Sequence, residues 1–203
     1  EVPTVHMSGE ERLALRKELE IRENSVVISY IAELNKNKNH QFLLKNWNEI
    51  KLLSPNAILL IIGKGNYEDE LKRYVLEKNI NDVKFLGFRS NIHQLLELSD
   101  IVTLLSHREG LPKSIMEAMV AKLPVVVTDT RGLRDLIINN ENGFVVSHED
   151  KIGLINAFVS LINNENLRKQ MGENGFEKVQ KYRLENVLKE YSFIYEDLLR
   201  KDG

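Results

Sequence analysis

The sequence of 203 residues contains no cysteine. Disulfide bridges, thiolate metal sites and cysteine nucleophiles are therefore excluded. Long apolar segments are also absent, since the longest uninterrupted run, Ala57–Ile62, is far short of the roughly 18 residues that cross a bilayer. The first twenty residues carry many charges and lack the apolar core of a secretory signal. We therefore expect a cytoplasmic protein.

The sequence has no marked excess of charge of either sign. Lys and Arg total 28 against 30 Asp and Glu, and the net charge of -2 gives no general attraction to nucleic acid or anionic lipid. The chain has no Asp-x-Asp pair, no Gly-x-x-x-x-Gly-Lys-Ser/Thr phosphate loop and no His-x-x-x-His spacing. We therefore expect no catalytic metal, no cofactor and no nucleic-acid partner.

The apolar residues that are present, 42% of the chain, are arranged in a regular alternation. Short β-branched runs occupy residues 26–31, 57–62, 83–88, 101–106, 124–129 and 143–147. Helical patterns occupy residues 9–19, 39–53, 67–79, 91–98, 112–121 and 132–138, followed by 150–163, 165–181 and 184–200. This alternation predicts an α/β protein with a Rossmann-like, doubly wound parallel sheet of about six strands, helices on both faces and C-terminal helices.

In such sheets ligands bind beyond the carboxyl ends of the strands, and the loop after the fourth predicted strand is the most informative one. Pro112 is suited to the first turn of a helix, and Gly110 allows backbone to approach a ligand closely. Glu109 precedes them, and Glu117 follows on the polar face of the predicted helix. If all eight steps were helical, the two acids would lie about 12 Å apart along one cleft wall. The alternative is a solvated Lys113–Glu117 pair with Glu109 as an ordinary loop acid.

The block that contains these residues reads EGLPKSIMEAMVAKLPVVVTD. It resembles the signature of the retaining glycosyltransferases of family 4, in which seven residues separate two glutamates, and an Ala-Met turn and a Pro-Val-Val strand follow. The resemblance extends from Val26 to the last helix, but it covers only the C-terminal, donor-binding half of such a two-domain GT-B enzyme.

The resemblance implies roles for residues of this loop and helix. Glu109 would hold hydroxyls of the donor sugar, and Glu117 would hold the nucleotide ribose. Backbone groups of Gly110 and Leu111 would contact the sugar and the diphosphate, with Pro112 beside them at the start of the helix.

The loop after the first predicted strand matches the family less closely. This chain has Ala32-Glu33-Leu34 where such enzymes usually have Gly-Arg-Leu, and then Lys38. By resemblance Lys38 is a diphosphate ligand with a catalytic role. Glu33 would repel a diphosphate, so either its side chain points away or the phosphate is held differently. Without the resemblance, Lys38 would be interpreted as part of a solvated turn.

Two further loops carry candidate binding residues. Gly63 and Gly65 resemble the family's glycine turn after the second strand, where small residues let the nucleotide come close. The alternative is a plain turn, since a bare Gly-x-Gly is usually no more than that. Gly87, Phe88 and Arg89 match the segment whose backbone commonly contacts the base. Phe88 or Arg89 could flank that base, and Phe88 could equally be a core residue.

The resemblance implies transfer of a sugar, with retention, from a nucleoside diphosphate sugar, with UDP weakly favoured, to a glycan or lipid-linked acceptor in polysaccharide biosynthesis. Residues 1–25 would be a linker and entry helix, 26–182 the nucleotide-sugar-binding domain, and 183–203 a helix crossing back to a missing N-terminal acceptor domain. The fragment alone would be inactive, and any contact with the inner face of the membrane would come from the missing half. The alternatives are a sugar-nucleotide epimerase of the same architecture and a non-catalytic sugar-nucleotide-binding subunit.

Overall fold

The computed structural model describes residues 7–182, so the helix expected over residues 184–200 lies outside the described residues. The strands of the sheet are β1 Val26–Ile31, β2 Ala57–Ile62, β3 Val83–Gly87, β4 Ile101–Leu104, β5 Val125–Thr128 and β6 Gly143–Val146. The helices are α1 Gly9–Glu18, η1 Lys36–Lys38, α2 His40–Leu53, α3 Glu68–Glu77, α4 Ile92–Leu98, α5 Lys113–Val120, α6 Arg131–Leu136, α7 Lys151–Asn163, α8 Glu165–Val179 and η2 Gln180–Tyr182.

The six strands form one parallel sheet in the order β3-β2-β1-β4-β5-β6. The strand order reverses between β1 and β4, which start the two halves of the sheet. The predicted α/β class, the doubly wound topology and the six strands are confirmed. In a sheet of this kind the crevice that accepts ligands opens at the carboxyl ends of the two strands at this reversal.

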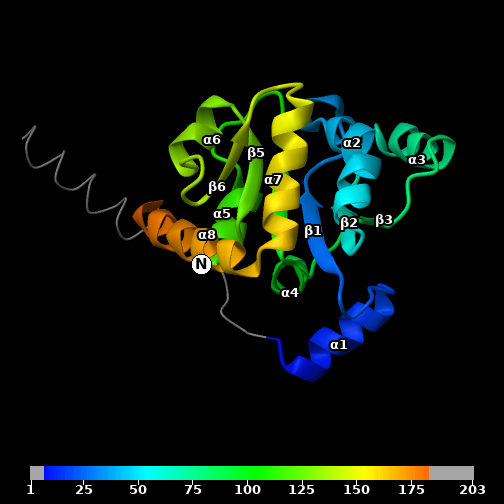
Figure 1. Cartoon of the computed structure of the whole chain (residues 1–203), viewed down its shortest axis with the longest axis horizontal. Helices are drawn as coiled ribbons and strands as arrows, with labels where there is room; N and C mark the ends of the chain where they lie inside the picture. Colours follow the sequence, from blue (N-terminus) through cyan, green and yellow to red (C-terminus); the bar gives the residue numbers. More distant parts are fainter. Residues whose placement is uncertain (1–6, 183–203) are drawn as a thin grey trace, which may run out of the picture.

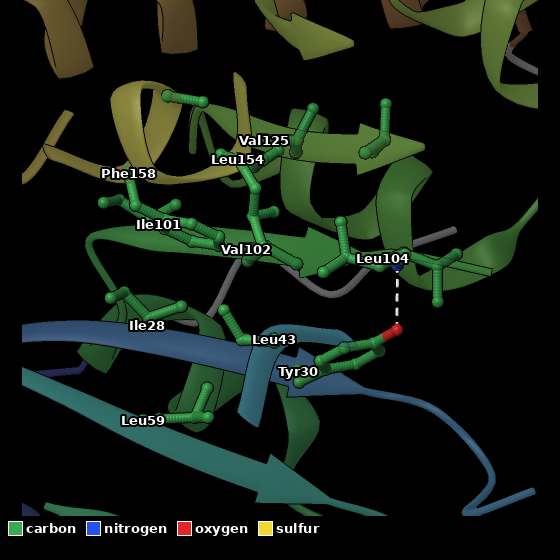
Figure 2. Close-up of a cluster of buried hydrophobic side chains, with 14 of the residues drawn as sticks. Ile28, Tyr30, Leu43, Leu59, Ile101, Val102, Leu104, Val125, Leu154 and Phe158 are labelled. Carbon is green, nitrogen blue, oxygen red and sulfur yellow. Dashed lines mark hydrogen bonds between the residues drawn. The ribbon is translucent and has the colours of Figure 1, made fainter. Parts of the chain in front are cut away.

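Helices cover both faces of the sheet (Figure 1). On one face α1 and α4 pack against Val27 of β1 and against β2 through Leu15, Leu19 and Leu95. The alternate residues of β1 and β2 point to the opposite face, where Figure 2 shows Ile28 with side chains of α2 and α7. Burial on both faces explains why these strands read as continuous apolar runs in the sequence.

The strand β4 is shorter than predicted, because it ends at Leu104 rather than at residue 106. Its register with β1 stops at the pair Tyr30 and Thr103. The amide of Leu105, the first residue after β4, donates its hydrogen bond to the Tyr30 hydroxyl instead of to a neighbouring strand. The chain therefore leaves the sheet two residues early and enters the loop that carries Glu109.

Candidate functional site

The candidate site lies where the chain leaves β1 and β4. Because these two parallel strands are neighbours, the loops that follow them, residues 32–39 and 105–112, lie side by side. Two hydrogen bonds join the loops directly. The His107 amide donates to the Asn37 carbonyl at 2.8 Å, and the Asn37 side-chain amide donates to the Arg108 carbonyl at 3.1 Å. The predicted binding loops thus form one unit.

A local sequence effect places Lys38 at this junction. The Asn35 side chain accepts a hydrogen bond from the Lys38 amide and caps the short helix η1. Asn39 then adopts a left-handed conformation with φ of 50°, which ends η1 and lets α2 start at His40. Asparagine tolerates this conformation better than most residues. Lys38 therefore precedes a sharp change of chain direction at the edge of the site.

The side chains of Lys38 and Glu109 meet across the two loops. Lys38 Nζ lies 2.5 Å from Glu109 Oε1, with 22% of the lysine and 9% of the glutamate side chain exposed. The structure thus brings together the two residues for which the sequence predicted a catalytic role. A cation and a carboxylate at the crevice of a parallel sheet can serve a ligand that carries both anionic oxygens and hydroxyl groups.

Glu117 lies on α5, the helix that directly follows the Glu109 loop, and it faces a cavity that Glu109 does not line. It lines a cavity of about 1670 Å³ whose walls come from α1, α4, α5 and α8, and Lys113 and Met116 line it as well. Lys113 Nζ lies 3.3 Å from Glu117 Oε1, so the i,i+4 pair exists, but 87% of the lysine side chain is exposed. Glu109 is not among the residues that line this cavity. Glu109 in the loop and Glu117 on α5 are therefore close in sequence, but they do not line this cavity together.

The turn from Glu109 into α5 is open to a ligand on one side and tightly packed on the other. A Cβ atom added to Gly110 would meet no atom within 4 Å, and Leu111 is half exposed. Pro112 is the N-cap residue of α5. A Cβ atom on Gly132 of α6, in contrast, would lie 1.3 Å from the Gly110 carbonyl oxygen. Gly132, which sequence reasoning missed, therefore sets how closely this turn approaches α6.

The glycines after β2 make room for the protein's own backbone. A Cβ atom on Gly63 would lie 1.9 Å from the Ala32 carbonyl oxygen, and one on Gly65 would lie 2.1 Å from that of Leu34. Both glycines thus let the β2 turn press against the loop that carries Lys38. The two glycines therefore have a packing role within the protein itself, in addition to the plain turn or the nucleotide contact that the sequence suggested.

The loop after β3 presents a free aromatic ring. Gly87 has a positive φ of 64°, which turns the chain at the end of the strand. Phe88 is 72% exposed, so the alternative that it is a core residue is wrong. Arg89 donates to Asn91 and forms an ion pair with Glu18 of α1 at 3.2 Å. Phe88 is therefore available to a ligand, whereas the Arg89 guanidinium already has partners.

Glu33 carries the charge that sets this chain apart from the family's usual pattern. Its side chain is exposed and accepts a hydrogen bond from the Asn35 side-chain amide at 3.0 Å. The exposure places this carboxylate in solvent, where salt screens its repulsion of an anion.

The sequence did not reveal a buried aromatic pair, Tyr30 and His40, that lies next to the loop of Lys38. The ring of His40 stacks on Tyr30 with centroids 4.0 Å apart, and it is only 1% exposed. Burial, followed by the nearby charge of Lys38, lowers the pKa of His40 to about 3. The sequence signal that could have revealed this pair is Tyr30 itself, because a tyrosine inside a buried apolar strand needs a hydrogen-bond partner for its hydroxyl.

Residues 7–182 contain no group of three or more His, Cys, Asp or Glu side chains that could hold a metal ion. Over the same residues no helix is both long and apolar enough to span a membrane.

Three comparisons relate this geometry to known proteins. Residues 11–178 match the family model described as glycosyl transferases group 1. The putative glycosyltransferase EpsD of Bacillus subtilis (strain 168) is 30% identical over 193 residues, which cover 95% of this chain and 51% of that protein. The capsular polysaccharide biosynthesis glycosyltransferase CapM of Staphylococcus aureus is 27% identical over 188 residues, which cover 88% of this chain and 48% of CapM.

The fold is also found among solved structures. The crystal structure of Anabaena Alr3699/HepE in complex with UDP-glucose superposes with a TM-score of 0.80 at 25% identity, and the match covers 96% of this chain and 54% of that one. The chain spans about half the length of the curated relatives it matches. The predicted fold, one half of a GT-B architecture, is therefore confirmed.

Proposed function

Because this chain belongs to the glycosyl transferases group 1 family, we propose that it is the donor-binding domain of a retaining glycosyltransferase. The donor is a nucleoside diphosphate sugar, with UDP as the favoured nucleotide. Residues 26–182 form the donor domain, and a second domain of the same protein binds a glycan or lipid-linked acceptor.

The observation that carries this proposal is the pairing of Lys38 with Glu109 at the junction of β1 and β4. The lysine supplies a positive charge for the diphosphate, and the carboxylate accepts hydrogen bonds from sugar hydroxyls. A diphosphate sugar needs both kinds of partner a few ångströms apart. No other ion pair of the described residues joins the loops that follow β1 and β4.

The chemistry follows from the charge that develops as the sugar leaves. When the bond between the anomeric carbon and the diphosphate breaks, the bonding electrons stay with the diphosphate oxygen. Lys38 and the backbone amides of Gly110, Leu111 and Lys113, around the start of α5, stabilise this negative charge. Glu109 holds the sugar hydroxyls during the step. The ribose contact implied for Glu117 is not part of this proposal, because Glu117 lines a separate cavity that Glu109 does not reach.

The relatives support the choice of donor and the biological setting. HepE was crystallised with UDP-glucose, and its fold overlies almost the whole of this chain. CapM is named for capsular polysaccharide biosynthesis. We extend a UDP-sugar donor and a role in polysaccharide biosynthesis to this chain on that basis.

Isothermal titration calorimetry with UDP and UDP-glucose tests donor binding. We expect both ligands to bind the chain and Lys38→Met to weaken UDP binding about tenfold or more, since a charged hydrogen bond to the diphosphate is lost. Lys36→Met is the matched control because Lys36 is an exposed lysine in the same loop. Absence of nucleotide binding by the folded chain, or equal losses in both variants, would refute the proposed site.

A transfer assay separates the proposal from its alternatives. The 203-residue chain should bind the donor without transferring the sugar, because the chain spans about half the length of its relatives. Rapid transfer by this chain alone would contradict an incomplete active site. Isomerised nucleotide sugar would identify an epimerase. Binding without turnover by the full-length protein with acceptor would identify a non-catalytic subunit.

A further inference from the structure

Tyr30 makes the only side-chain hydrogen bonds from within a strand to both site loops among the residues that the structure describes. It belongs to β1 and is completely buried. Its hydroxyl donates a hydrogen bond to the Lys38 carbonyl and accepts one from the Leu105 amide at 2.8 Å. Figure 2 shows the second bond as the dashed line that reaches from Tyr30 to the end of β4. One phenol group therefore connects the loop of Lys38 to the loop of Glu109.

Both bonds hold backbone atoms of the two loops that carry the charged side chains. The Lys38 carbonyl belongs to the residue whose Nζ meets Glu109, and Leu105 starts the loop that reaches Glu109 four residues later. The hydroxyl has one proton to donate and can accept a bond, so it is satisfied on both sides. The ion pair between Lys38 and Glu109 joins the same two loops through their side chains.

The surroundings keep Tyr30 in this geometry. Its ring stacks on His40, the first residue of α2, at an interplanar angle of 28°. Burial raises the pKa of Tyr30 above its usual value, so the phenol keeps the proton that it donates to Lys38. The low pKa of His40 keeps that ring neutral as well. Tyr30 and His40 thus form an uncharged, buried pair that contacts the loop of Lys38.

We infer that Tyr30 is a positioning residue that sets the separation of Lys38 and Glu109 by fixing the backbone of both loops. It acts through these two residues, and its buried hydroxyl does not reach a ligand itself. Of the two tests below, only the one that measures nucleotide binding depends on the proposed function. If Tyr30 were simply a core residue, removing its hydroxyl would lower stability without a specific effect on the two loops.

Hydrogen exchange on the ligand-free chain tests the connection directly. Tyr30→Phe keeps the ring against His40 and removes both hydrogen bonds. We expect exchange in residues 35–39 and 105–110 to become about tenfold faster while the central strands are unchanged. Thr103→Val is the matched control, because it removes a buried strand hydroxyl whose hydrogen bond goes to the Val126 carbonyl of β5 and to neither loop. Unchanged exchange in the two loops, or equal effects of both variants, would overturn the inference.

A double-variant cycle then tests whether Tyr30 acts through Lys38. Tyr30→Phe should weaken UDP binding about five- to twentyfold in the wild-type background and less than about twofold in a Lys38→Met background. Losses that simply add would show that Tyr30 does not work through Lys38 and would refute the positioning role. If the wild-type chain binds no UDP, the proposed function fails, and the exchange result alone decides the role of Tyr30.

Discussion

Lys38 and Glu109 lie 71 positions apart in the sequence, yet Lys38 Nζ is 2.5 Å from Glu109 Oε1. The lysine that is proposed to bind a diphosphate therefore already has an anionic partner. A diphosphate must compete with Glu109 for this cation, unless both anions share its three N–H donors.

Replacing Glu109 should therefore strengthen the binding of UDP without a sugar. In Glu109→Gln the competing negative charge is gone, and we expect UDP affinity to rise about three- to tenfold. UDP-glucose should gain less, because the charged acceptor for its hydroxyls is lost too. Calorimetry with both ligands measures the difference. Glu33→Gln, an exposed acid in the opposite loop, is the control and should change UDP affinity less than about twofold. Weaker UDP binding in Glu109→Gln would contradict the competition.

Removing the lysine should destabilise the fold. In Lys38→Met the Glu109 carboxylate, with 9% of its side chain exposed, loses its cation, and we expect a loss of about 1 to 3 kcal/mol in the free energy of unfolding. Lys113→Met is the control, since Lys113 pairs with Glu117 while almost fully exposed, and it should cost less than about 0.5 kcal/mol. Urea denaturation measures both. The double variant Lys38→Met with Glu109→Gln should recover part of the loss, and no recovery would show that the unpaired carboxylate is not the cause.

The contact between Gly132 and the Gly110 carbonyl leads to a prediction about backbone packing. The added Cβ atom of Gly132→Ala would lie 1.3 Å from that oxygen, so the turn or α6 must move. We expect a loss of about 2 to 4 kcal/mol in the free energy of unfolding. Gly110→Ala, where a Cβ meets nothing within 4 Å, should cost less than about 1 kcal/mol. Thermal unfolding compares the two, and equal shifts in melting temperature would refute this explanation.

The fold could be predicted from the sequence because its strands are buried on both faces. Runs such as Ala57–Ile62 form strands over the expected residues, since apolar β-branched segments bounded by turns have few other stable arrangements. The end of β4 could not be predicted in this way. Directly after this strand the Leu105 amide donates to the Tyr30 hydroxyl, a tertiary contact that no local pattern encodes.

The candidate site was predicted in part. Lys38 and Glu109 were each placed in a strand-end loop, but their pairing depends on β1 and β4 being neighbours in the sheet. Gly63 was chosen for its small size, and its close contact with the Ala32 carbonyl is visible only in three dimensions. The role of His40 could not be predicted, because an isolated histidine in a sequence carries no information about what lies against its ring.

His40 should make the stability of the protein dependent on pH. Its pKa in the folded protein is about 3, whereas that of an unfolded histidine is about 6.5. Between these values the unfolded chain takes up a proton that the folded protein excludes. The stability that neutral His40 contributes is therefore fully present above about pH 6.5 and is lost as the pH falls toward 3. At pH 5 the loss relative to pH 8 is about 2 kcal/mol.

His40→Phe isolates this contribution, because it keeps a ring against Tyr30 and removes the group that titrates. Urea denaturation at pH 8 and pH 5 should show a fall in the free energy of unfolding that is about 2 kcal/mol smaller in the variant than in the wild type. All other titrating groups are shared, so they cancel in the comparison. Thr103→Val changes no titratable group and should show the same pH dependence as the wild type. Equal falls in His40→Phe and the wild type would mean that the folded protein accommodates a protonated His40, which its buried, unpartnered ring nitrogens argue against.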